Sequence, residues 1–239
     1  MKKINTILAA FGALLMLSVT SANSIELKAG VSLNGMAAYA NAKETLKDSG
    51  AVTNAEAILA TNYVSGYFEV SSEEIMGMGI GVSYAPDVVD LNSESRTLTA
   101  CIDNTITEAA GCTASTEADS GTTNVSAKIE DLISVYVTLP VGDTGAYVKA
   151  GYIQATMITE ESLATGSAYN DVDLTGSELA GGIERPLGDM AFWRAEGSFQ
   201  MWDDIEASGS ETGADGVSKN QIRAELGSVT GSLSVGMKF

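Results

Sequence analysis

Charged side chains recur within the apolar segments of this chain, and most of them are carboxylates. Paired carboxylates could suggest acid–base hydrolysis, because a carboxyl group can give a proton to a reacting group or take one from it. The chain of 239 residues contains no histidine. Ser-His and Cys-His catalysis and many metal sites depend on imidazole. The composition therefore excludes these classes and leaves paired-carboxylate hydrolysis as a weak alternative.

Other candidate sites are also weakly supported. The run Gly77-Met78-Gly79-Ile80-Gly81 has the wrong spacing for a nucleotide-binding loop and fits a strand with small residues pointing inward. Two acidic segments, 170–178 and 203–206, offer oxygen ligands that calcium accepts, but neither keeps EF-hand spacing. A solvated surface is the preferred interpretation, and no cofactor is expected. The net charge of −18 argues against nucleic-acid binding.

The last thirteen residues, 227–239, alternate strictly between apolar and small polar side chains. One face carries Leu233, Val235, Met237 and Phe239, whereas serine, threonine and glycine fill the other. A period of two is typical of a β-strand with one apolar face. A strand that ends on an aromatic residue, with apolar residues at every second position before it, fits a lipid-facing strand. It resembles the C-terminal insertion signal of bacterial outer-membrane barrels.

The same alternation recurs along the chain and predicts eight strands. Seven lie at 25–39, 60–71, 76–84, 125–139, 146–157, 176–184 and 190–202, and the eighth ends at residue 239. Their connections alternate between long and short. The long ones are 41–59, which could hold a helical turn at 55–59, then 85–124, 159–175 and 203–218; the short ones are 72–75, 140–145 and 185–189. Short periplasmic turns, long extracellular loops and an even strand number characterise outer-membrane barrels.

The N-terminal segment predicts export. Lys2 and Lys3 precede an apolar run of eleven residues, Ile7–Leu17, and the small residues before Ala22 suit a cleavage site. The run is shorter than the ~20 residues that a membrane-spanning helix needs. We therefore expect a cleaved signal peptide at 1–22, followed by one barrel domain at 23–239 that reaches the outer membrane through the periplasm.

Several short motifs carry a resemblance to a known superfamily. They are the segments Leu233–Phe239, Tyr147–Tyr152 and Gly181–Glu184, and the segment that runs from Arg194–Glu196 to Trp202–Asp204. Together with the strand pattern they resemble the OmpA/OmpX/opacity-type outer-membrane barrels. The resemblance implies an all-β, eight-stranded, antiparallel, up-and-down transmembrane barrel. Enzymes among small barrels, such as lipid A deacylases, palmitoyltransferases and omptin proteases, would each require an active-site histidine that this chain lacks.

The strand parity directs eight charged side chains toward the barrel interior: Glu26, Lys28, Glu69, Lys149, Glu178, Glu184, Arg194 and Glu196. Eight strands enclose a space that side chains just fill, and buried charges must be paired or solvated. We expect a structural network in which Arg194 and Lys149 bridge carboxylates. The alternative is a narrow cation path, favoured by five carboxylates against three cations and by Gly77, Gly79 and Gly81.

The remaining predictions concern the loops and partners. Cys101 and Cys112 are the only cysteines, and export to an oxidising compartment predicts a disulfide between them. The expected partners are outer-membrane lipid and the barrel assembly machinery, the latter through the C-terminal strand, and the chain is expected to be a monomer. A non-enzymatic structural or surface-interaction role in envelope integrity or adhesion is the preferred function, and a cation-preferring diffusion pore is the alternative.

Overall fold

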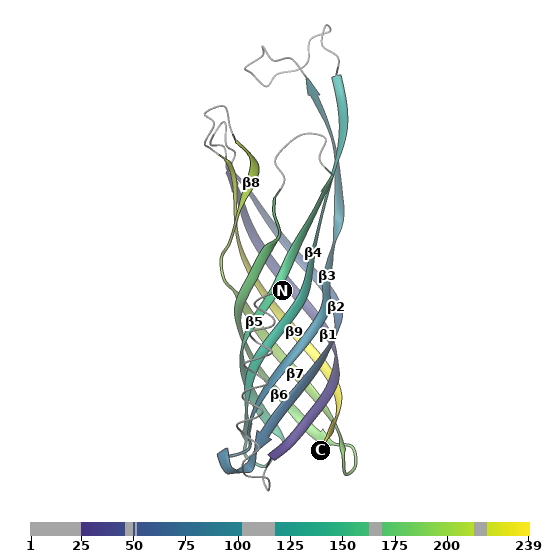
Figure 1. Cartoon of the computed structure of the whole chain (residues 1–239), viewed down its shortest axis with the longest axis vertical. Helices are drawn as coiled ribbons and strands as arrows, with labels where there is room; N and C mark the ends of the chain where they lie inside the picture. Colours follow the sequence, from purple (N-terminus) through teal and green to yellow (C-terminus); the bar gives the residue numbers. More distant parts are fainter. Residues whose placement is uncertain (1–24, 46–49, 51, 102–117, 163–168, 213–218) are drawn as a thin grey trace.

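The computed structural model describes residues 25–45, 50, 52–101, 118–162, 169–212 and 219–239. This part of the chain forms nine β-strands and one short 3-10 helix, η1 (Glu73–Ile75) (Figure 1). None of its helices is long and apolar enough to span a membrane. The strands are β1 (Ile25–Thr45), β2 (Val52–Ser72), β3 (Met78–Cys101), β4 (Ala118–Val141), β5 (Ala146–Ser162), β6 (Val172–Pro186), β7 (Ala191–Trp202), β8 (Ile205–Thr212) and β9 (Lys219–Lys238).

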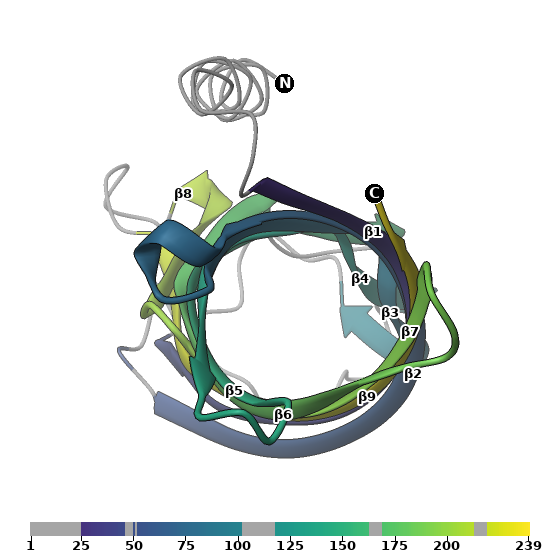
Figure 2. The same ribbon diagram turned by 90° about the horizontal axis from the view of Figure 1, so that it is seen from below.

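Antiparallel pairing runs through the order β1-β2-β3-β4-β5-β6-β7-β9-β8, and β1 also pairs with β9. That last pairing closes the sheet into a barrel, seen as a ring in Figure 2. At the closure, Leu27 and the terminal Phe239 exchange two backbone hydrogen bonds, of 3.2 and 2.9 Å. The predicted all-β antiparallel barrel is confirmed. The predicted signal peptide at 1–22 lies outside the described residues.

The described chain has nine strands where the sequence predicts eight. β7 pairs with the lower part of β9 and β8 with its upper part, so the two strands share one position in the wall. Asp203 and Asp204 separate them. The Asp203 amide donates to the Thr175 carbonyl at 2.7 Å, and the Thr175 hydroxyl donates to the Asp203 carboxylate. These two bonds hold the interruption against β6 in place of regular strand pairing.

An apolar belt surrounds the lower part of the barrel. It includes outward side chains that solvent or lipid can reach, such as Val31, Leu33, Val64, Leu179 and Val229. The residues predicted as the insertion signal, Leu233, Val235, Met237 and Phe239, also lie on this outer face. An outward apolar band on a closed antiparallel barrel is the surface that outer-membrane barrels present to lipid. The belt therefore places this fold in the outer membrane.

The polarity of the two faces inverts above the belt. Along β1 the outer face passes from Leu33 and Tyr39 to Asn41 and Lys43, while the inner face passes from Ser32 to Met36 and beyond. A matching change occurs in β9, whose upper outer residues include Arg223, paired with Glu206 at 3.0 Å. The upper wall is thus polar outside and apolar inside, as in a water-soluble barrel.

This inversion explains where the predicted loop boundaries are wrong. The long connections predicted at 41–59, 85–124, 159–175 and 203–218 are largely strand in the described residues. The predicted helical turn at 55–59 lies within β2 and is also wrong. Apolar-out alternation ends where the lipid ends, but backbone pairing continues beyond it. The β3–β4 hairpin extends farthest above the belt (Figure 1).

An apolar cluster fills the upper interior, and we call it the upper plug. Aliphatic side chains from six strands contribute to it, together with Tyr63. Its buried members are Met36, Ala38, Tyr63, Ala85, Val88, Ile129, Leu132, Ile153, Ala155, Leu174 and Ile205. Close packing of these groups leaves the hollow of the barrel blocked at this height.

All three connections at the periplasmic end are short, as predicted. Met76 and Gly77, with φ of 60° and 72°, form the β2–β3 turn, so Gly77 is not part of the predicted inward-facing strand. Gly145 in the β4–β5 turn has φ of 69°, and a Cβ there would meet the Glu184 carbonyl at 2.5 Å. Glycine is required at that position because both the conformation and the close approach exclude a side chain.

The predicted disulfide stays a prediction. Cys101 is the last residue of β3, and Cys112 lies outside the described residues. We expect non-reduced protein to show a mass deficit of two hydrogens in the peptide spanning both cysteines. Closing a loop of this size contributes about 3 kcal/mol by chain entropy. Two alkylatable thiols in protein isolated from the outer membrane would rule the bridge out.

Candidate functional site: the charged interior

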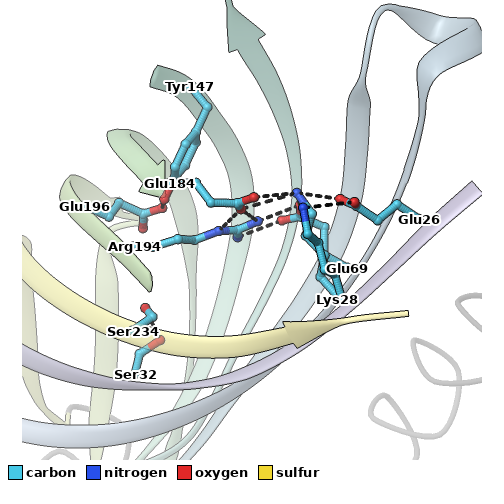
Figure 3. A network of polar contacts seen from close by, with 10 residues as sticks. Glu26, Lys28, Ser32, Glu69, Tyr147, Glu184, Arg194, Glu196 and Ser234 are labelled. Carbon is cyan, nitrogen blue, oxygen red and sulfur yellow. Dashed lines mark hydrogen bonds and ion pairs between the residues drawn. The ribbon is translucent and has the colours of Figure 1, made fainter. Parts of the chain in front are cut away.

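The eight predicted interior charges lie together inside the lower barrel. They come from five strands, β1, β2, β5, β6 and β7, and form two clusters that we name after their central cations. The Arg194 cluster also contains Lys28, Glu26, Glu69 and Glu184, and all of these residues are labelled in Figure 3. The Lys149 cluster also contains Glu178 and Glu196. The structure thus gathers the whole set that strand parity directs inward.

Arg194 of β7 binds two carboxylates from two other strands. Its Nη1 and Nη2 donate to the two Glu69 oxygens at 2.9 and 2.8 Å, and its Nε donates to Glu184 at 2.7 Å (Figure 3). The planar guanidinium matches a carboxylate with two parallel hydrogen bonds, which fixes orientation as well as charge. Arg194 is only 6% exposed, so this cation depends on these partners for its solvation.

Lys28 of β1 extends the same cluster toward the periplasmic end. Its Nζ donates to Glu184 at 3.0 Å and lies 3.2 Å from Glu26. Glu26 is at the rim, where Lys238 also approaches it at 3.5 Å. The cluster therefore joins β1, β2, β6 and β7 across the barrel and continues to its periplasmic opening.

The Lys149 cluster lies beside the first. Lys149 Nζ contacts Glu196 at 2.5 Å and Glu178 at 3.3 Å. The Tyr147 hydroxyl donates to Glu196 at 2.8 Å, and the Ser134 hydroxyl donates to Glu178 at 3.2 Å. Each carboxylate of this cluster thus has a cation and a neutral donor, which is how buried charges are stabilised.

An aromatic layer surrounds these charges, and sequence reasoning missed it as a unit. The Arg194 guanidinium lies 5.2–5.3 Å from the ring centres of Tyr67, Tyr147 and Phe192, and Lys149 lies 5.0 Å from that of Tyr136. Cations at such distances are attracted by the ring quadrupole. The rings add attraction without adding charge.

Each aromatic ring of this layer lies over a glycine directly opposite on a neighbouring strand. The four pairs are Tyr67 with Gly30, Tyr136 with Gly81, Tyr147 with Gly182, and Phe192 with Gly236. A Cβ at these glycines would collide with the ring. The sequence contains a usable signal, because each of these four inward glycines faces an inward aromatic residue once the strand register is known.

This pairing corrects the interpretation of the inward glycines as space for an ion path. The Tyr136 ring covers Gly81. At Gly79, a Cβ would lie 2.5 Å from the Thr138 hydroxyl and 3.1 Å from the Glu69 carboxylate. Both residues are glycine because neighbouring side chains already fill the space that a Cβ would need.

A small polar cavity remains between the charge clusters and the upper plug. Its volume is about 60 Å³, enough for a few water molecules. Seven serines line it, together with residues of both layers: Ser32, Ser65, Ser83, Ser134, Ser198, Ser232 and Ser234. Ser32 and Ser234 are hydrogen-bonded to each other at 2.7 Å (Figure 3). The cavity is bounded below by ion pairs and above by apolar side chains.

The acidic segments weighed as calcium sites have other partners in the structure. Asp171 accepts a hydrogen bond from the Thr159 amide at 3.3 Å, and Asp203 accepts one from Thr175. Within the described residues, no group of three or more His, Cys, Asp or Glu side chains is arranged to hold a metal ion. These two aspartates therefore form hydrogen bonds near the ends of strands, Asp171 to β5 and Asp203 to β6.

Comparisons with known proteins give matches to solved structures alone. No protein-family model matches the chain, and no curated protein matches its sequence. The outer membrane protein OprG from Pseudomonas aeruginosa is similar over 89% of this chain and 97% of its own, with 13% identity and a TM-score of 0.45.

Two further structures are similar at lower TM-score. Ail of Yersinia pestis, an attachment invasion locus protein, matches 89% of this chain and 99% of its own at 9% identity and TM-score 0.39. The outer membrane protease OmpT from Escherichia coli matches 93% and 99% at 11% identity and TM-score 0.42. By its own closed sheet, apolar belt and charged interior, this chain has the fold of the small outer-membrane β-barrels.

Proposed function

We propose that the protein is a closed, non-enzymatic barrel that anchors extracellular strands and loops in the outer membrane for a structural or surface-interaction role. The filled interior is the observation that carries this proposal. Two ion-pair clusters, side by side within an aromatic layer, fill the lower barrel, and the upper plug fills it above them. Among the described residues, the polar upper wall remains exposed to the cell exterior.

The interior chemistry supports a structural role over hydrolysis. Each of the carboxylates Glu69, Glu178, Glu184 and Glu196 lies within 4 Å of a lysine or arginine nitrogen. A general acid or base must reach a substrate, and the adjacent cavity holds only a few waters. The chain also has no histidine to take that role.

The alternative is a cation-preferring pore, which the five-to-three ratio of interior carboxylates to cations favours. Conduction would require ions to pass both the bidentate Arg194–Glu69 pair and the upper plug. Breaking a buried pair costs about 3–5 kcal/mol. Apolar constrictions also stop ions by excluding water.

Planar-bilayer recording tests the closed-anchor proposal. We expect purified, folded protein to give no discrete openings, with a general porin recorded in the same bilayers as the positive control. Arg194→Ala combined with Glu69→Ala removes the bidentate ion pair from the lower barrel but leaves the upper plug in place. The ion leak through this double variant should therefore increase only if the upper plug is also displaced. Reproducible cation-selective openings of the unmodified protein would contradict the proposal and support the pore.

A further inference from the structure

The Lys149 cluster carries more negative than positive charge. Among the described residues, Glu178 and Glu196 both have Lys149 as their only ion-pair partner, and all three side chains are largely buried. The Arg194 cluster, by contrast, has as many cations as carboxylates once Lys238 at the rim is included. One buried carboxylate of the Lys149 cluster therefore has no opposite charge of its own.

The hydrogen bonds of this cluster mark both carboxylates as ionised. Glu178 accepts from the Ser134 hydroxyl at 3.2 Å and from the Gln200 amide at 3.4 Å, one bond on each oxygen. Glu196 accepts from the Tyr147 hydroxyl at 2.8 Å. A protonated carboxyl group needs an acceptor for its O–H, whereas each of these partners donates. The excess negative charge therefore requires a cation nearby.

The polar cavity beside this cluster faces hydroxyl groups that lack a partner. Glu178, Glu196 and Thr230 of β9 all line the cavity. Thr230 is 8% exposed, and its Oγ1 has no hydrogen-bond partner of normal geometry among the described residues, although Tyr63 lies nearby. The Tyr67 hydroxyl, which lines the same cavity, has none either. Buried hydroxyl groups are normally bonded, so these two indicate a ligand in the cavity.

The strand register places Thr230 at a height between the two carboxylates. Gln200 of β7 lies directly opposite Glu178 of β6, and Glu196 lies farther down the same β7 strand. Ser198, midway between Gln200 and Glu196, lies directly opposite Thr230 and also lines the cavity. The lining near the excess charge is therefore rich in oxygen atoms, which are the ligands that hard cations prefer.

We propose that this cavity binds one alkali-metal cation, Na⁺ or K⁺, next to Glu178 and Glu196. A single positive charge balances the Lys149 cluster. The cavity volume of about 60 Å³ admits one such ion together with a few water molecules. Thr230 and Ser198 supply neutral oxygen ligands, so the carboxylates alone set the charge of the site. The bound ion is a structural part of the closed barrel, a role that goes beyond the proposed anchoring function.

A divalent cation fits the site less well. It would replace an excess negative charge by an excess positive one in the same buried place. Calcium takes about six to eight oxygen ligands, several of them carboxylates. Within the described part of the chain, no group of three or more acidic, histidine or cysteine side chains could hold a metal ion. The site therefore suits an ion of charge one that accepts hydroxyl oxygens and water.

Urea unfolding in lipid vesicles tests the inference through the identity of the salt. The barrel is folded at one pH in NaCl, in KCl or in choline chloride, whose cation is too large for the cavity. Choline also keeps the ionic strength constant as the alkali concentration is varied, so the screening of surface charges does not change. We expect a higher urea midpoint in an alkali salt, rising with the logarithm of its concentration, because the ion binds the folded state.

Three variants separate the site from general salt effects. Glu178→Gln removes the excess charge and keeps the shape, so the dependence on alkali ions should disappear. Thr230→Val removes one ligand and should raise the required alkali concentration about tenfold. In choline, the Thr230→Val variant should be no less stable than the unmodified barrel, because an unpartnered hydroxyl is gone. Glu206→Gln neutralises an exposed carboxylate of the upper wall and should keep the alkali dependence.

Equal urea midpoints of the unmodified barrel in alkali and choline salts would overturn the inference and would show that water or a proton balances the cluster. An alkali dependence that persists in folded Glu178→Gln would also overturn it. The gel shift between unboiled and boiled samples shows which variants fold. Glu196→Gln removes the same excess charge and replaces Glu178→Gln if that variant does not fold.

Discussion

Arg194→Leu is expected to lower the free energy of unfolding by about 3–5 kcal/mol. The substitution removes the bidentate partner of Glu69 and one of the partners of Glu184, while both carboxylates remain in the interior. Glu69 is 1% exposed, and its remaining cation, Lys28, is 3.8 Å away. An uncompensated buried carboxylate is the source of the cost. The measurement is urea unfolding of the barrel in detergent or lipid vesicles.

Arg223→Leu is the matched control, because it breaks an arginine–glutamate pair of similar length on the surface. The side chains of Arg223 and Glu206 are 69% and 65% exposed, and a pair of this kind contributes less than about 1 kcal/mol. Glu69→Leu combined with Arg194→Leu should recover part of the loss, since the stranded carboxylate is gone. Similar small effects for Arg194→Leu and Arg223→Leu would show that the interior network is solvated.

Gly81→Ala is expected to destabilise the barrel by about 1–3 kcal/mol, the usual cost of overpacking. The added methyl group would overlap the Tyr136 ring, which is 4% exposed and packs against Lys149. The ring can move only by disturbing the charge clusters. Urea unfolding in the same lipid measures the effect, and the gel shift shows whether the variant folds.

Gly197→Ala makes the same chemical change on the outer face of a strand. A Cβ there meets no atom within 4 Å, so no overlap arises. We expect a neutral or slightly stabilising effect, because alanine restricts the unfolded chain more than glycine does. Equal effects of Gly81→Ala and Gly197→Ala would contradict the aromatic–glycine packing and point to backbone propensity alone.

The sequence predicts the lower barrel well because lipid and a narrow interior impose opposite demands on alternate residues. Leu233 and Val235 must face outward when Ser234 faces inward, and the rule holds through Phe239. The same parity places Glu69, Arg194 and the other interior charges without knowledge of the register. Parity of single strands is therefore enough to list the members of the network.

Other features depend on relations between strands and could not be read from one strand at a time. The pairing of Tyr136 with Gly81 and that of Tyr147 with Gly182 both require the register. The upper strands were missed for a different reason. Lys43 and Met36 reverse the lower pattern, so a search for apolar-out alternation treats the upper part of β1 as loop.

The inversion of polarity along β1 and β9 also fixes the depth at which the barrel can stand in the membrane. Moving it outward would bring Leu33 and Leu233 into water, and moving it inward would bring Lys43 and Arg223 into hydrocarbon, where each cation costs up to about 2–4 kcal/mol at mid-depth. The extracellular strands are therefore held at a constant height above the lipid, and a thinner or thicker bilayer has to adjust to the protein.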